Sequence, residues 1–164
     1  MGSETQVKVK STTRGSGRAI DLWGWALTLL EEPADNGDAA LVFEARTRSG
    51  GAVPPHTEDN HESFYVLEGV FEIEVDGELY RCEVGDHLAI APGVLHSLRN
   101  AGPGWGRLLI RTSPGSQHLR FFEALGEPLA PGADPTPLTA PPEFEPIAAA
   151  GRESGMHFVP PAAG

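Results

Sequence analysis

Alternation of apolar and polar residues is the clearest pattern between residues 20 and 112. Residues 71–76 alternate as FEIEVD, and Gly77 follows Asp76. A two-residue period is typical of a strand with one buried face, and an Asp-Gly pair favours a tight hairpin turn. We therefore expect the chain to reverse at residues 76–77 and to pair residues 71–75 with residues 78–84.

Similar runs predict the other strands. Residues 41–46 alternate as LVFEAR, and the apolar run at residues 20–30 is interpreted as one strand with Trp23 and Trp25 on the same face. Further short strands are expected at residues 64–67, 87–90 and 107–112, with Gly or Pro between them. Many short strands separated by turns predict a sandwich or a barrel.

The pattern changes after Pro114. Ser116 is expected to cap a helix in which Leu119, Phe122 and Leu125 recur every three residues, and Gly126 is its predicted end. The six prolines in residues 127–142 favour an extended segment that wraps the surface. A second short helix near residues 143–152 and a strand near 156–159 complete the prediction, which places helices only near the C-terminus.

The chain of 164 residues is expected to fold as one domain. Its first 18 residues are polar and rich in Gly, Ser and Thr, which predicts a flexible arm or an edge strand. Residues 19–115 form the predicted barrel, and residues 116–164 carry the helices and the proline-rich segment. Because such an arm could cover an exposed sheet edge of a second copy, we expect a homodimer.

Charge and cysteine content exclude several classes of partner. Lys and Arg total 12 against 23 for Asp and Glu, a formal net charge of -11, which disfavours nucleic acid and anionic membrane. The lone Cys82 excludes an intramolecular disulfide and is expected in the core. The N-terminus has no apolar run typical of a signal peptide or a membrane span, so we expect a cytoplasmic protein.

Titratable residues gather around positions 56–62 and 96. On a strand, residues two apart share a face, so His56 and Glu58 should point the same way. Glu62 should lie on the inner face of the next strand, together with Phe64. If the strand that carries His96 lies beside these two, imidazoles and carboxylates converge on one point.

These segments resemble the two motifs of the cupin superfamily, specifically its small single-domain members of the quercetin-dioxygenase-like type. The first motif is a Gly, five residues, His-x-His, three or four residues, Glu, six residues and Gly; the second is a Gly, five residues, Pro-x-Gly, two residues, His, three residues and Asn. The matching residues here are Gly50 or Gly51, His56, Glu62 and Gly69, then Gly85, Gly93, His96 and Asn100. Glu58 replaces the second His of the first motif, and Ala91 takes the Pro position of the second. The resemblance implies an all-β double-stranded β-helix, a jelly-roll barrel, with short C-terminal helices.

The resemblance also implies a divalent metal ion, because cupins usually bind one through the three motif histidines and the motif Glu. Here the ligands would be His56, Glu58, Glu62 and His96, and the added oxygen donor favours Fe(II), with Mn, Ni and Zn as alternatives. Without Glu58, the other three would form a two-His, one-carboxylate triad with open positions. His61 is the alternative fourth ligand, although strand parity points it to the opposite face.

The leading functional interpretation is an O₂-using, dioxygenase-like oxidoreductase that acts on a small apolar or aromatic molecule, because a metal with open positions can bind substrate and oxygen together. The first alternative is a lyase, isomerase or cyclase in which Glu62 or Glu58 moves a proton, with or without metal. The second is a cupin that binds a small molecule without turnover.

Other residues have less specific patterns. His87 begins a predicted strand and could line the cavity or face solvent, whereas His118 and His157 lie outside the motifs and are expected at the surface. Aromatic residues could stack on a substrate, but a plain core role is favoured for all of them. They are Trp23, Trp25, Phe64 and Phe71.

Overall fold

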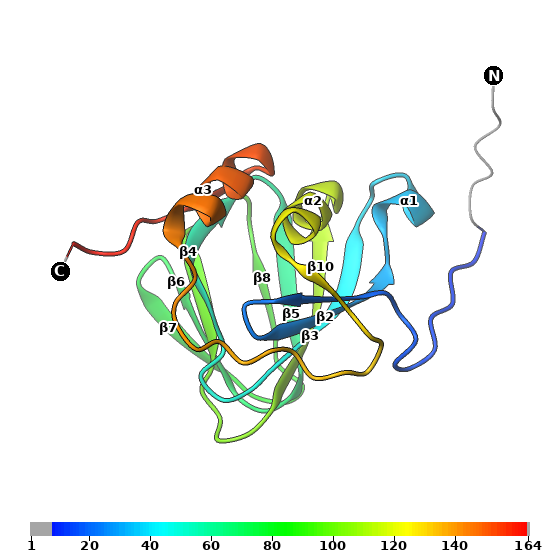
Figure 1. Ribbon diagram of the computed structural model, residues 1–164, viewed down its shortest axis with the longest axis horizontal. Helices are drawn as coiled ribbons and strands as arrows, with labels where there is room; N and C mark the ends of the chain where they lie inside the picture. Colours follow the sequence, from blue (N-terminus) through cyan, green and yellow to red (C-terminus); the bar gives the residue numbers. More distant parts are fainter. Residues whose placement is uncertain (1–7, 164) are drawn as a thin grey trace.

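The computed structural model describes residues 8–163, in which two antiparallel sheets form a barrel (Figure 1). In spatial order the larger sheet contains β11 (Glu127–Leu129), β1 (Ala19–Leu22), β2 (Trp25–Glu31), β3 (Leu41–Thr47), β10 (Gly106–Ser113), β5 (His61–Glu68) and β8 (His87–Ile90). The smaller sheet contains β12 (Met156–Phe158), β4 (Ala52–Glu58), β9 (His96–Asn100), β6 (Phe71–Val75) and β7 (Glu78–Cys82). The double-stranded β-helix expected from the motifs is confirmed.

Alternation along the strands directs apolar side chains between the sheets. Strand β3 buries every second residue, as its sequence pattern predicts, and Phe43, Phe64 and Phe71 are almost fully buried. The hairpin at Asp76-Gly77 is also confirmed, since Val75 faces Glu78 and both turn residues have a positive φ. This backbone geometry suits the twist of paired strands, and Asp and Gly tolerate it.

The interpretation of residues 20–30 as one strand is wrong. Trp23 and Gly24 have φ values of 54° and 79° and form the turn between β1 and β2, which pair with each other. Trp25 therefore lies in a strand, whereas Trp23 lies in a turn. A continuous apolar run hides such a turn, because the residues on both sides of it are buried in the same core.

Helices are not confined to the C-terminus, contrary to the prediction. The single-turn α1 (Pro33–Asn36) lies between β2 and β3, where Pro33 suits the first helical position and the Asp35 carboxylate accepts a hydrogen bond from the Glu32 amide. Within residues 8–163, the helices are all too short or too polar to cross a membrane.

The two predicted C-terminal helices are present as α2 (Ser116–Leu125) and α3 (Phe144–Glu153). The Asp38 carboxylate, rather than Ser116, accepts hydrogen bonds from the first amides of α2. Figure 1 shows both helices at the same end of the barrel, and β12 adds to the edge of β4. We call α2, α3 and β12 together the C-terminal cover.

Candidate metal centre

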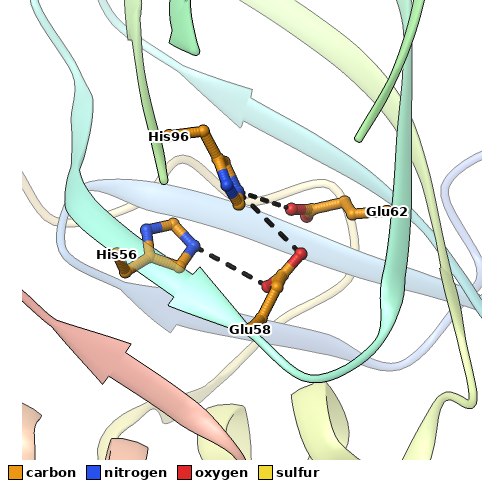
Figure 2. Close-up of side chains that lie close together, drawn as sticks. All are labelled: His56, Glu58, Glu62 and His96. Carbon is orange, nitrogen blue, oxygen red and sulfur yellow. Dashed lines mark hydrogen bonds and ion pairs between the residues drawn. The ribbon is translucent and has the colours of Figure 1, made fainter. Parts of the chain in front are cut away.

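Four titratable side chains meet inside the barrel (Figure 2). His56 and His96 are direct partners across β4 and β9, and their ring centroids lie 4.4 Å apart. Glu58 follows His56 by two residues on β4, whereas Glu62 extends from β5 in the opposite sheet. All four are buried, so the geometry follows the strand parity expected from the sequence.

The distances between the four side chains match those of ligands around one ion. One ligand atom from each residue lies within 4.8 Å of all the others. His96 Nε2 is 3.1 Å from Glu62 Oε2 and 3.9 Å from Glu58 Oε1, and His56 Nε2 is 3.7 Å from Glu58 Oε2. Ligands that each sit about 2 Å from a central ion lie roughly 3–4 Å from one another, so a divalent ion fits between these groups.

Backbone carbonyls orient both imidazole rings. His56 Nδ1 lies 2.8 Å from the Pro54 carbonyl oxygen, and His96 Nδ1 lies 2.9 Å from that of Val94. A carbonyl oxygen only accepts, so each Nδ1 carries the hydrogen and donates it. The Nε2 atoms face the centre, as in histidines that ligate metals.

Glu58 supplies the strongest evidence that a cation belongs here. It is 1% exposed, and among residues 8–163 no hydrogen bond of normal geometry reaches either carboxylate oxygen. A buried carboxylate without a regular hydrogen bond is costly, because the neighbouring imidazoles replace only part of the hydration that it has lost. A divalent cation bound by these four residues would compensate for that loss.

The site perturbs the pKa values of Glu62 and His96 in opposite directions. Burial raises the pKa of Glu62, but its contacts with His118 and His96 outweigh burial and hold the pKa well below its usual range. Burial lowers the pKa of His96, but the Glu62 carboxylate outweighs it and raises the pKa. Without a metal ion, this pair therefore favours a carboxylate beside an imidazolium.

The prediction that His118 lies at the surface is wrong. This residue of α2 is 3% exposed, and its Nε2 lies 3.1 Å from Glu58 Oε2 and 3.5 Å from Glu62 Oε1. One sequence signal could have placed it: His118 precedes Phe121 and Phe122 by three and four residues, so all three share the apolar face of the predicted helix.

Two influences on the His118 proton oppose each other. Burial lowers the pKa of His118, but the Glu58 and Glu62 carboxylates outweigh burial and raise the pKa to about 10, which would protonate both ring nitrogens. However, Asn60 Nδ2 lies 3.0 Å from His118 Nδ1 and can only donate to it, which leaves no room for a hydrogen on Nδ1. A cation bound by the carboxylates would offset the charge that favours the second proton, and His118 would then keep only the hydrogen on Nε2.

The remaining histidines lie outside the cluster. His61, the alternative fourth ligand, is exposed at the start of β5, and His87 is exposed at the start of β8. His157 is exposed on β12, as expected. Cys82 is buried, as predicted, and burial raises the pKa of its thiol.

Comparison with known proteins identifies a domain within the chain. A model of the cupin domain matches residues 43–110. The barrel also superimposes on an RmlC-like cupin from Shewanella frigidimarina, with a TM-score of 0.60 and 22% identity, over 70% of this chain and 99% of that one. A predicted oxalate decarboxylase from Thermotoga maritima gives a TM-score of 0.58 and 20% identity, over 62% of this chain and 97% of that one. The chain therefore contains a cupin domain.

The cupin also resembles one curated enzyme in sequence. It is 38% identical over 76 residues to quercetin 2,3-dioxygenase from Bacillus subtilis (strain 168). The match covers 44% of this chain and 22% of that enzyme, so it spans only about a fifth of the relative's length.

A small, largely apolar cavity of about 60 Å³ adjoins the cluster of this cupin. His56, Glu62 and His118 reach its wall, which otherwise consists mainly of apolar side chains from the barrel and the C-terminal cover. Trp23 and Phe121 meet edge to face in that wall, and the Phe158 ring stacks on His56 at 4.9 Å.

The four aromatic candidates divide between core and cavity. The core role expected for Phe64 and Phe71 agrees with their burial. Trp25 is also buried in the core, stacked on Phe71, and borders the cavity, whereas Trp23 is only partly buried and lines the cavity. The site therefore combines buried polar groups with an apolar chamber.

Proposed function

We propose that this cupin binds one divalent metal ion through His56, Glu58, Glu62 and His96. The observation that carries the proposal is the buried Glu58 carboxylate, which has no hydrogen bond of normal geometry from residues 8–163 and lies within 4.8 Å of three further ligand atoms. Two carboxylates and two imidazoles form a hard donor set, which favours Fe(II), with Mn, Ni or Zn as alternatives.

We further propose that the protein is an O₂-using oxidoreductase acting on a small apolar or aromatic molecule. Likeness to a quercetin 2,3-dioxygenase and the apolar cavity beside the cluster support this class. A bound divalent metal with open positions would supply Lewis acidity and bring substrate and O₂ together.

The chain's own residues suit that chemistry. Trp23, Phe121 and Phe158 can orient an apolar ring and exclude water from it. The carboxylates of Glu58 and Glu62 can accept a proton from a substrate hydroxyl, since both lie beside imidazoles that stabilise or relay charge.

Elemental analysis of protein prepared without added metal tests the metal site, and oxygen uptake by the Fe(II)-loaded protein tests the reaction. We expect about one divalent ion per chain and O₂ consumption with at least one member of a panel of small phenols and enols. Negligible affinity for every divalent ion offered would contradict the metal site. Full loading with Fe(II) but no oxygen uptake with any compound of the panel would count against an O₂-using oxidoreductase.

A lyase, isomerase or cyclase is the second candidate. The specific observation in its favour is that Glu62 lies between two imidazoles, 3.1 Å from His96 Nε2 and 3.5 Å from His118 Nε2. Such a group can take a proton at one position while a neighbouring imidazole returns one elsewhere. Turnover that survives complete removal of metal by a chelator would favour this candidate.

The homodimer remains a proposal. Residues 1–7 of the predicted arm lie outside the described residues, whereas residues further along contact the same chain: Thr12 Oγ1 donates to the Leu30 carbonyl, and Leu29 N donates to that of Arg18. Light scattering at tens of micromolar protein is the test, and a monomeric mass there would contradict the dimer.

A further inference from the structure

His118 contacts both carboxylates of the cluster without being one of its four candidate ligands. Its Nε2 is within 3.5 Å of both Glu58 and Glu62, yet His118 does not belong to the group of ligand atoms that lie within 4.8 Å of one another. It is therefore placed to hold the ligands rather than to join them.

Asn60 determines which nitrogen of His118 carries the hydrogen. Its Nδ2 is 2.9 Å from the Pro114 carbonyl oxygen and 3.0 Å from His118 Nδ1. A carbonyl oxygen only accepts, so the NH₂ group of Asn60, rather than its side-chain oxygen, must face Pro114. The second hydrogen of that NH₂ group is then available for His118 Nδ1. The hydrogen of a neutral His118 ring accordingly sits on Nε2, toward Glu58 and Glu62.

The replacement of a motif histidine by Glu58 creates a need for such a donor. A histidine ligand offers one lone pair, whereas a carboxylate offers two oxygens, only one of which needs to face the ion. Glu58 Oε1 lies 3.9 Å from His96 Nε2, whereas Oε2 lies 3.1 Å from His118 Nε2 and 3.7 Å from His56 Nε2. The Nε2–H of His118 lies close to both carboxylates, and its contact with Glu58 is short without having the geometry of a regular hydrogen bond.

We infer that His118 is a positioning residue of the metal site: the contact of its Nε2–H with Glu58 Oε2 and Glu62 Oε1 leaves the other oxygen of each carboxylate, the one near His96, to face the ion. The inference rests on the proposed metal site and assigns a role to a helix outside both motifs. Donors that orient metal ligands typically contribute 10–100-fold to metal affinity.

Titration of the metal-free full-length protein with Co(II), against a competing chelator and with its visible absorption recorded, tests the inference. We expect one Co(II) per wild-type chain, and for His118→Leu a dissociation constant about 10–100-fold higher with shifted absorption bands. His118→Gln, which restores an N–H donor near the position of Nε2, should recover most of the affinity and the wild-type bands. His157→Leu, at an exposed histidine of β12, is the matched control and should behave as wild type.

The outcomes separate the two proposals. A wild-type chain that binds no Co(II) overturns the metal site itself, and the role of His118 with it. Binding by the wild type together with unchanged affinity and bands in His118→Leu overturns only the positioning role, even if thermal stability falls. Should His118→Leu fail to fold, Asn60→Ser replaces it: weaker binding with shifted bands supports the inference, and wild-type behaviour overturns it.

Discussion

The barrel strands and the C-terminal cover meet at the same site but contribute differently to it. Strands β4, β5 and β9 supply all four candidate ligands, and the register between His56 and His96 is maintained by backbone pairing. The cover supplies His118, Phe121 and Phe158, which surround the ligands and the cavity. Strand pairing fixes the backbone positions of the ligands, whereas the cover orients the carboxylates through His118 and encloses the site. Changes in the strands should therefore remove the metal, and changes in the cover should only modulate it.

The largest expected effect on metal binding comes from His96→Ala, which removes a ligand on strand β9. Removing one of four ligands leaves the coordination incomplete, so we expect loss of stoichiometric metal, and the same for His56→Ala. Elemental analysis after metal loading and desalting measures the amount of bound metal per chain. His61→Ala, at an exposed neighbour on β5, is the matched control and should retain one ion per chain. Metal retained in His96→Ala would move the chemistry to acid–base catalysis, and metal lost in His61→Ala would make His61 a ligand.

Glu58 gives the next largest effect, since it is the strand residue that departs from the motif. We expect Glu58→His to keep the metal and Glu58→Ala to weaken binding by at least about 10-fold, because both changes act on one coordination position. Metal binding and product formation should be measured on both variants. Retained metal with turnover lowered by about 10²–10⁴-fold in both would instead indicate a proton-transfer role. Wild-type values in both would show that Glu58 has no role in the site.

A smaller expected effect is the pH dependence of the stabilisation that a bound metal ion provides. His96 has a raised pKa, so its stabilising charge is fully present below the ordinary value of 6.5 and is lost as pH rises through the folded pKa. Glu62 has a lowered pKa, so its contribution is present above 4.5 and is lost as pH falls through the folded pKa. The pair therefore stabilises the metal-free protein most between these two values. An ion must displace the His96 proton, so added Mn(II) should raise the melting temperature more at about pH 8 than at about pH 6. A pH-independent increase would argue against His96 as a ligand.

The smallest effect on metal affinity is expected from the aromatic packing of the cover. Phe158 contacts His56 by ring stacking and offers no ligand atom, so Phe158→Leu should change metal affinity by less than about threefold and stability by about 1 kcal/mol. Metal titration and thermal unfolding check both values. A loss of affinity above about tenfold would mean that the aromatic packing of the cover, and not only its His118, orients the ligands.

Parity and motif spacing were sufficient to predict the barrel and the convergence of His56, Glu58, Glu62 and His96. A strand has only two faces, so the position of one inward residue determines its neighbours two apart. The same reasoning placed His61 on the opposite face, where the structure has it. It failed at Trp23-Gly24, because a turn between two buried strands leaves the apolar pattern uninterrupted.

The sequence by itself determined the strands, their inward faces and the four residues that converge, because these depend on short-range periodicity and on spacing along one chain. Only the tertiary structure decided that His118 lies against Glu58 and Glu62, 60 and 56 positions earlier in the chain. That contact depends on how α2 docks over the barrel end, and docking is set by the packing of Phe121 and Phe122 and by Asp38 at the helix start. Local patterns identify the apolar face of a helix, but they carry no information about the surface on which that face packs.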